Sequence, residues 1–155
     1  MPAVYLNELN VNPPSATDVP FEYVELRGDP NTSLSNLAFV AIEGSVASAT
    51  DRGTANIVIN LNTRRLGSNG LLMIKSPSGG FTGIPSATTV VTDSLFNTLP
   101  GGLPNGAQSY MLIFSPSPLT VGTDYDANND GLLELPSGAR IVDSVGWSDN
   151  LPDSL

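Results

Sequence analysis

The segment 124–135, DYDANNDGLLEL, holds the residues whose types and spacing could do chemistry. Oxygen-bearing side chains alternate at Asp126, Asn128 and Asp130, and Gly131 follows them. Side chains at alternate positions of a tight loop can turn toward one centre, and Ca²⁺ binds about six to eight oxygens. A glycine at the next position lets the chain fold back sharply. The order D-x-N-x-D-G therefore predicts a structural Ca²⁺ site.

The expected ligands lie within this loop and its close neighbours. The carbonyl of Leu132 would follow the glycine, and Glu134 falls at the ninth loop position, where a carboxylate can bind directly or through water. The twelfth position is Ser137 rather than the bidentate glutamate of an EF-hand, so the site is expected to be weak, with a Kd of roughly 10⁻⁴–10⁻³ M. The predicted ligand set is Asp124, Asp126, Asn128, Asp130, Leu132 and Glu134.

A solvated acidic turn is the alternative interpretation of this loop, because Asp and Asn side chains commonly cap local backbone N–H groups. Against it stand four carboxylates within the eleven residues 124–134, where no Lys or Arg occurs. Holding like charges so close is unfavourable unless a cation neutralises them.

Catalytic chemistry has few candidates in this chain. There is no cysteine and no histidine, so thiol nucleophiles, zinc–thiolate sites and the commonest general base are absent. Glu8, Glu22 and Glu25 lie in expected strands, but Glu22 and Glu25 should point to opposite faces. A paired-carboxylate hydrolase needs two acids in one cleft, and the sequence does not indicate that Glu8 meets either of the others. We therefore expect no enzymatic activity.

The elements that must position these residues are short strands. Apolar, β-branched and aromatic runs alternate with turns rich in Gly, Pro, Asn and Ser, without a sustained helical period. The expected strands are 4–11, 21–27, 37–43, 56–61, 71–75, 88–92, 110–114 and 140–147. They predict an all-β fold, an antiparallel sandwich or barrel of about eight strands with at most one short helix at 93–98. One domain is expected over 1–155, with a core over 3–148 and a tail or linker at 149–155.

The composition limits the partners. The net charge is −9, with 15 acidic and 6 basic residues among 155, which disfavours nucleic acid and anionic membranes. No apolar run is long enough to span a membrane, and the first residues lack the pattern of a signal peptide. The sole tryptophan, Trp147, is expected to plug the core rather than to stack on a sugar.

Three stretches together resemble the bacterial lamin tail domain family: VYLNELNV, FEYVELRGDPNTSLSNLAFVAIEG and ARIVDSVGWSD. The matching residues are Asn7, Glu8, Glu22, Tyr23, Glu25, Leu26, Leu34, Ser35, Asp143, Val145 and Trp147. The resemblance implies an immunoglobulin-like β-sandwich, like those of secreted or surface-attached modules that are not themselves catalytic. Such modules are often joined to nucleases, phosphatases or adhesive regions. The family has no general calcium loop, so the loop prediction depends on its own residues.

Together these features predict a non-enzymatic extracellular or cell-surface structural or adhesion module that is stabilised by one Ca²⁺. The missing export signal departs from that location and leaves a cytosolic one open. Two alternatives remain: a calcium-dependent module that binds carbohydrate or protein, and a subunit that assembles with itself or other surface proteins through strand edges. An exposed Trp147 or Tyr125 near the ion would favour carbohydrate binding.

Overall fold

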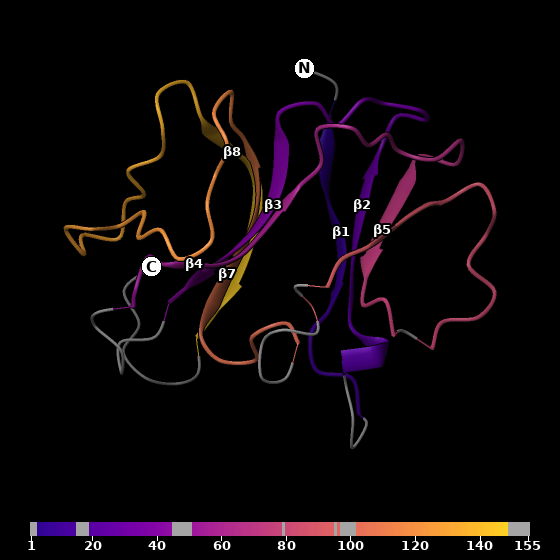
Figure 1. Cartoon of the computed structure of the whole chain (residues 1–155), viewed down its shortest axis with the longest axis horizontal. Coiled ribbons are helices and arrows are strands. Elements are labelled where there is room, and N and C mark those ends of the chain that lie inside the picture. Colours follow the sequence, from indigo (N-terminus) through magenta and orange to yellow (C-terminus); the bar gives the residue numbers. More distant parts are fainter. Residues whose placement is uncertain are drawn as a thin grey trace. The chain divides into compact units, whose positions relative to one another are not determined.

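The computed structural model describes residues 3–14, 19–44, 51–78, 80–94, 96 and 102–148. In these residues eight strands form two four-stranded sheets (Figure 1). The predicted all-β class is therefore confirmed, and the strand content is that of a β-sandwich. A 3-10 turn, η1, covers Val19–Phe21. Of the short helix expected at 93–98, Phe96 is helical, while 95, 97 and 98 lie outside the described residues.

The first sheet has the strand order β1-β2-β5-β6. Its strands are β1 (Val4–Asn10), β2 (Tyr23–Gly28), β5 (Leu71–Lys75) and β6 (Thr89–Thr92). The pairs β1·β2 and β2·β5 are antiparallel, but β5 and β6 run parallel. This parallel pair departs from the antiparallel pairing predicted for the sandwich. The connection 76–88 crosses over instead of closing a hairpin, as a parallel neighbour requires.

The second sheet has the strand order β4-β3-β7-β8 and is antiparallel throughout. Its strands are β3 (Leu37–Glu43), β4 (Ala55–Asn60), β7 (Gln108–Phe114) and β8 (Arg140–Trp147). β3 lies between two neighbours and is buried from Leu37 to Ile42 on both of its faces. That burial explains why its sequence, LAFVAIE, is a continuous apolar run rather than an alternating one.

The chain divides by its contacts into two compact units, each holding one sheet. Met1–Ser35 with Thr63–Asn105 forms the first unit, and Asn36–Asn62 with Gly106–Leu155 forms the second. A single domain over 1–155 stays a prediction, and the tail or linker expected at 149–155 lies outside the described residues. No helix of the described residues is long and apolar enough to cross a membrane.

One face of the second sheet is covered by the chain that connects β7 to β8. Buried side chains of the sheet, among them Val40, Ile42 and Ile113, form a cluster with Leu119 and Tyr125 of that connection. Leu133 and Leu135 pack against the same cluster. Apolar residues on both sides of the acidic segment therefore hold the loop against its sheet, beside β8 in Figure 1.

Candidate functional site

The acidic loop is held by backbone pairing as well as by apolar packing. Gly122 N donates to Ala55 O and Ala55 N donates to Thr123 O, each at 2.9 Å. Thr54 and Asp124 form an antiparallel bridge, and Tyr125 N donates to Gly53 O at 2.9 Å. The loop thus continues the sheet at the start of β4, and its first acidic residues have a fixed register.

Asp126 is a fully buried carboxylate at the centre of this loop. Its Oδ1 accepts a hydrogen bond from Asp130 N at 3.0 Å, and its Oδ2 accepts one from Gly131 N at 3.1 Å. The backbone has a positive φ at Asn129 (57°) and Gly131 (84°), which turns successive N–H groups toward the carboxylate. A carboxylate offers about four lone-pair positions, so Asp126 can accept these bonds and still bind a cation.

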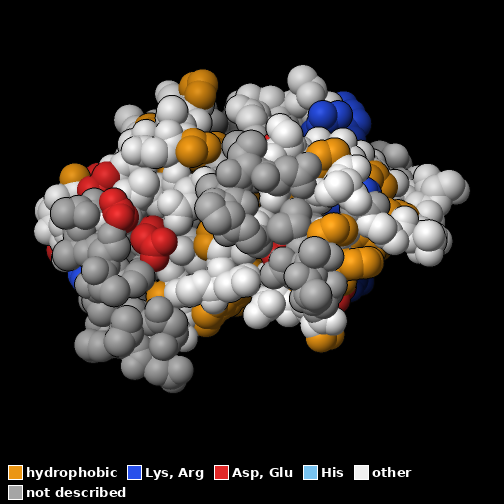
Figure 2. Space-filling view, turned by 60° about the horizontal axis from the view of Figure 1, so that its bottom comes forward, with side chains coloured by type: hydrophobic (Ala, Val, Ile, Leu, Met, Phe, Trp, Pro, Cys, Tyr) orange, Lys and Arg blue, Asp and Glu red, His pale blue; other side chains and the backbone are white. Residues whose placement is uncertain are grey.

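Asp126, Asp130 and Glu134 bring one carboxylate oxygen each to within 4.8 Å of one another. Oxygens that bind a single Ca²⁺ at 2.3–2.6 Å lie at most about 5 Å apart, so this spread is compatible with one shared ion. Asp130 and Glu134 are exposed while Asp126 is buried, so the group opens to solvent on one side. Figure 2 shows acidic side chains gathered at the surface of the protein.

Hydrogen bonds hold the two exposed carboxylates in place. Glu134 Oε2 accepts from Ala127 N at 2.9 Å, and Glu134 N donates to Tyr125 O at 2.5 Å. Asp130 Oδ1 accepts from Leu132 N at 2.8 Å. The three carboxylates are therefore positioned by the loop backbone, as a preorganised site requires.

The other predicted ligands have different surroundings. Asp124 lies outside the three-carboxylate group, and its Oδ1 accepts from Asp126 N at 2.9 Å. Asn128 contacts Asp130 twice, through its Oδ1 to Asp130 N at 2.9 Å and through its Nδ2 to Asp130 Oδ2 at 3.1 Å. The Leu132 side chain is 72% exposed. Its carbonyl, the predicted ligand, is therefore positioned by the loop backbone and not by side-chain packing. These capping contacts are also those expected of an acidic turn, and the six-ligand set stays a prediction.

The three strand-associated glutamates occupy two different environments. Glu22 is buried just before β2, where its Oε2 accepts from Leu103 N at 2.6 Å. Glu8 and Glu25 are direct cross-strand neighbours and line a groove of about 270 Å³ with Tyr23. Glu22 and Glu25 do point apart, as predicted, but Glu8 and Glu25 meet, which the sequence alone did not indicate. None of the described residues lining this groove belongs to the acidic loop.

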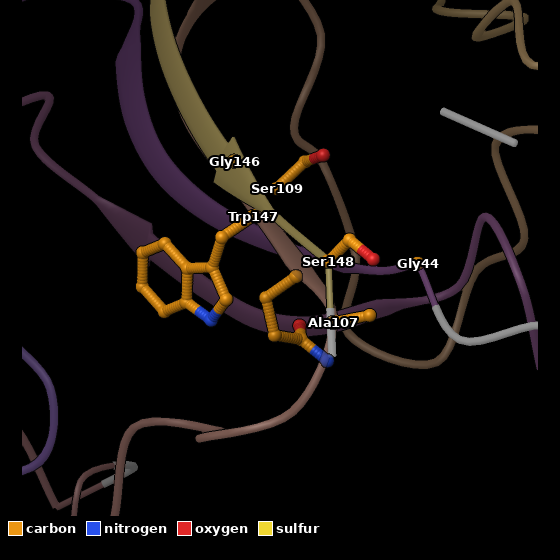
Figure 3. Close-up of a pocket in the computed structure, with 7 residues that line it drawn as sticks. Gly44, Ala107, Ser109, Gly146, Trp147 and Ser148 are labelled. Atoms are coloured by element: carbon orange, nitrogen blue, oxygen red, sulfur yellow. The ribbon is translucent and has the colours of Figure 1, made fainter. Parts of the chain in front are cut away.

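Trp147 is 37% exposed, so the prediction that it plugs the core is wrong. Its indole packs on Tyr110 with the ring centroids 5.1 Å apart, at the end of a strand that is mostly exposed. It borders a pocket of about 340 Å³ with Ser109 and Ser148 among the lining residues (Figure 3). Tyr125, in contrast, is 6% exposed, and its hydroxyl accepts from Thr120 N. Of the two aromatic residues considered for ligand stacking, only Trp147 is accessible.

No family model matches this chain, and no curated protein matches its sequence. The bacterial lamin tail domain resemblance therefore stays a prediction that rests on the short stretches quoted above. The function has to be argued from the sites themselves.

Gly53 positions the loop in a way that the sequence did not reveal. It has a φ of +81°, and a Cβ there would come within 2.6 Å of Asp124 Oδ1 and 2.8 Å of Asp126 N. We expect Gly53→Ala to lower the free energy of unfolding by about 1–2 kcal/mol for the left-handed backbone and by about 1–3 kcal/mol more for the overlap. Gly83→Ala is the matched control, because Gly83 has a φ of +80° with nothing within 4 Å of its Cβ position. Urea unfolding measures both, and equal losses would contradict the close packing at Gly53.

Tyr23 gives the groove a pH dependence. Burial, then its hydrogen bond to Glu8 and the charges of Glu8 and Glu25, raise the pKa of Tyr23 from 10.0 to about 12. Because the pKa of Tyr23 is higher in the folded protein than in the unfolded chain, folding favours the protonated hydroxyl. This contribution to stability should be constant below pH 10, the pKa in the unfolded chain, and should disappear as the pH rises toward 12. The stability difference between the wild type and Tyr23→Phe should shrink over that range in urea unfolding. A difference titration at 295 nm should place the Tyr23 midpoint near 12, and a midpoint near 10 would contradict the prediction.

Proposed function

We propose that this chain is a non-enzymatic structural or adhesion module of an extracellular or cell-surface protein, stabilised by one Ca²⁺ in the 124–134 loop. The observation that carries the proposal is the group formed by Asp126, Asp130 and Glu134, whose carboxylate oxygens lie within 4.8 Å of one another. Three like charges at such a separation repel, and a bound divalent cation converts that repulsion into attraction. With no histidine or cysteine in the chain, every side-chain ligand is an oxygen, which suits Ca²⁺.

The proposed location follows from the expected affinity. Three carboxylates on one side of an open group leave several of the six to eight Ca²⁺ positions to the amide of Asn128, the carbonyl of Leu132 and water. Such partial ligand sets belong to modules with a Kd of about 10⁻⁴–10⁻³ M. Only the millimolar Ca²⁺ outside cells would fill a site of this kind. The lamin tail domain resemblance supports the same location.

Ca²⁺ should raise the melting temperature because it binds the folded loop and not the unfolded chain. At ten times the Kd the gain is about 1.4 kcal/mol, which corresponds to a few degrees in Tm for a chain of this size. Thermal melts in EDTA, in ~5 mM Ca²⁺ and in ~5 mM Mg²⁺ at fixed ionic strength measure it. Mg²⁺ should act less, since it demands near-ideal octahedral geometry.

Two amide variants test the site while keeping the hydrogen bonds that the loop backbone donates to these side chains. Asp130→Asn and Glu134→Gln keep an oxygen that can accept from Leu132 N and Ala127 N, respectively. Each should melt at or above the wild type in EDTA, because repulsion is relieved, and should lose most of the Ca²⁺ response. Asp29→Asn, in the turn after β2, removes the same charge and should keep the full response. An unchanged Tm on adding Ca²⁺ to the wild type would leave the loop as an acidic turn.

A second candidate function, carbohydrate binding, is favoured by the exposure of Trp147. The indole borders the 340 Å³ pocket, and Figure 3 draws the hydroxyls of Ser109 and Ser148 beside the end of β8. Ligand sites commonly combine an aromatic surface with a few polar groups that fix orientation. Tyr110 already covers part of the ring, so a sugar would have to stack on the exposed part.

The single tryptophan makes this candidate simple to test, because all indole fluorescence comes from Trp147. Titration with neutral and acidic oligosaccharides should shift the emission if a sugar stacks there, and Trp147→Phe should weaken binding measured by calorimetry. Repeating the titration in EDTA distinguishes calcium-dependent from calcium-independent binding. A concentration of ~10 mM oligosaccharide detects binding with a Kd up to about 10 mM. Unchanged emission at that concentration would contradict carbohydrate binding.

A further inference from the structure

The groove over β1, β2 and β5 combines two carboxylates with apolar walls. Glu8 and Glu25 lie directly opposite each other on neighbouring antiparallel strands, an arrangement that destabilises a sheet when both residues carry the same charge. Asn7 Nδ2 donates to Glu25 Oε1 at 2.6 Å, and the Tyr23 hydroxyl bonds Glu8. Neither contact supplies a positive charge. The described residues that line the groove include no Lys or Arg.

The walls beside these carboxylates are aromatic and aliphatic. Tyr23 and Phe81 meet edge to face, with their centroids 5.3 Å apart and their planes at 90°. Met73, which is 7% exposed, pairs with Glu25 across β2 and β5, and Leu71 lines the groove beside it. Aromatic rings and aliphatic side chains therefore line this groove together with the two carboxylates.

This combination selects among cations. Ca²⁺ requires about six to eight oxygens, and a groove walled by rings and thioether cannot supply them. An alkylammonium group fits both parts, because its aliphatic stem can cover apolar surface while its charged end reaches the carboxylates. Aromatic rings add attraction for a cation placed over their faces. The cavity of about 270 Å³ is small, which suits one side chain rather than a large ligand.

We propose that this groove binds a lysine side chain presented by a polypeptide partner, with Glu8 and Glu25 as the charged contacts and Tyr23 and Phe81 as the walls. The polypeptide source is argued from the surface next to the groove. Phe21, 40% exposed, contacts Phe81, and Val90, 41% exposed, pairs with Met73. Residues flanking the lysine could cover these side chains, whereas a free amine could not. The net charge of −9 would attract such a partner.

The test uses the full chain and three probes, two peptides of matched size and the free amine that corresponds to the lysine side chain. Acetyl-Val-Lys-Val amide, its norleucine counterpart and butylammonium are titrated at low ionic strength and followed by two-dimensional amide NMR. The lysine peptide should shift the amides of Tyr23, Glu25, Met73 and Phe81 with a Kd of ~1–10 mM, and added salt should weaken it. The norleucine peptide, which lacks the charge, should bind at least about tenfold more weakly.

Charge-neutralising variants assign the contacts. Glu25→Gln keeps Oε1 for the bond from Asn7, and Glu8→Gln keeps an acceptor for Tyr23, so both should fold, as a thermal melt checks. Each should weaken the lysine peptide several-fold, while Asp29→Asn, the matched change of net charge outside the groove, should not. If Glu25→Gln alone disturbs the fold, Glu8→Gln carries the test.

Four results would overturn the proposal. These are equal binding of the norleucine peptide, equal binding of butylammonium, shifts confined to the amides of the 124–134 loop, and no shift with any probe at ~50 mM, well above the expected Kd. The first would leave an apolar groove, and the second would assign it to a free amine. The third would leave only diffuse attraction of cations to acidic side chains.

Discussion

The buried carboxylate of Asp126 is the constraint on which the acidic loop depends. A fully buried carboxylate is stable only when hydrogen bonds or a cation compensate for lost hydration. Here the N–H groups of Asp130 and Gly131 bond it directly. To bring them there, the chain must turn through positive φ at Asn129 and Gly131. The same turn carries Asp130 and Glu134 to the Asp126 side chain, so satisfying one buried anion assembles the whole carboxylate group.

The loop can meet this constraint because apolar packing and backbone pairing hold its framework. Leu119, Tyr125 and Leu133 pack on the sheet, and the backbone pairs with 53–55 at the start of β4. Burial of several apolar side chains, each contributing on the order of 1.5–3 kcal/mol, exceeds the gain expected from a weak Ca²⁺ site. The proposed Ca²⁺ would therefore relieve repulsion within a formed loop rather than fold it. That is why the effect of an ion would be modest and would depend on its concentration.

The parts of the fold that could be predicted from the sequence are those that depend on local interactions. All eight strands were predicted, with 37–43, 71–75 and 140–147 matching the observed bounds of β3, β5 and β8, because apolar pattern and turn residues act over a few positions. Strand pairing is not local. The parallel β5·β6 pair and the bulge between Leu6 and Glu8 depend on distant partners. That bulge sets the register that places Glu8 opposite Glu25, so their meeting had no signal in the sequence. Asp126, Asp130 and Glu134 had one, since their approach is settled within nine residues.

The loop cluster of Asp126, Asp130 and Glu134 and the groove pair of Glu8 and Glu25 both crowd negative charge, but their surroundings differ in kind. In the loop the neighbours of the anions are amide and carboxylate oxygens and backbone N–H groups, a polar environment in which a small ion can replace its water ligands one by one. In the groove the neighbours are the rings of Tyr23 and Phe81 and the side chain of Met73. A small divalent ion would lose water there without gaining oxygen ligands, whereas an alkylammonium group would bury its stem as its charge is neutralised. The composition of the walls, more than the number of carboxylates, would therefore decide which cation each proposed site holds.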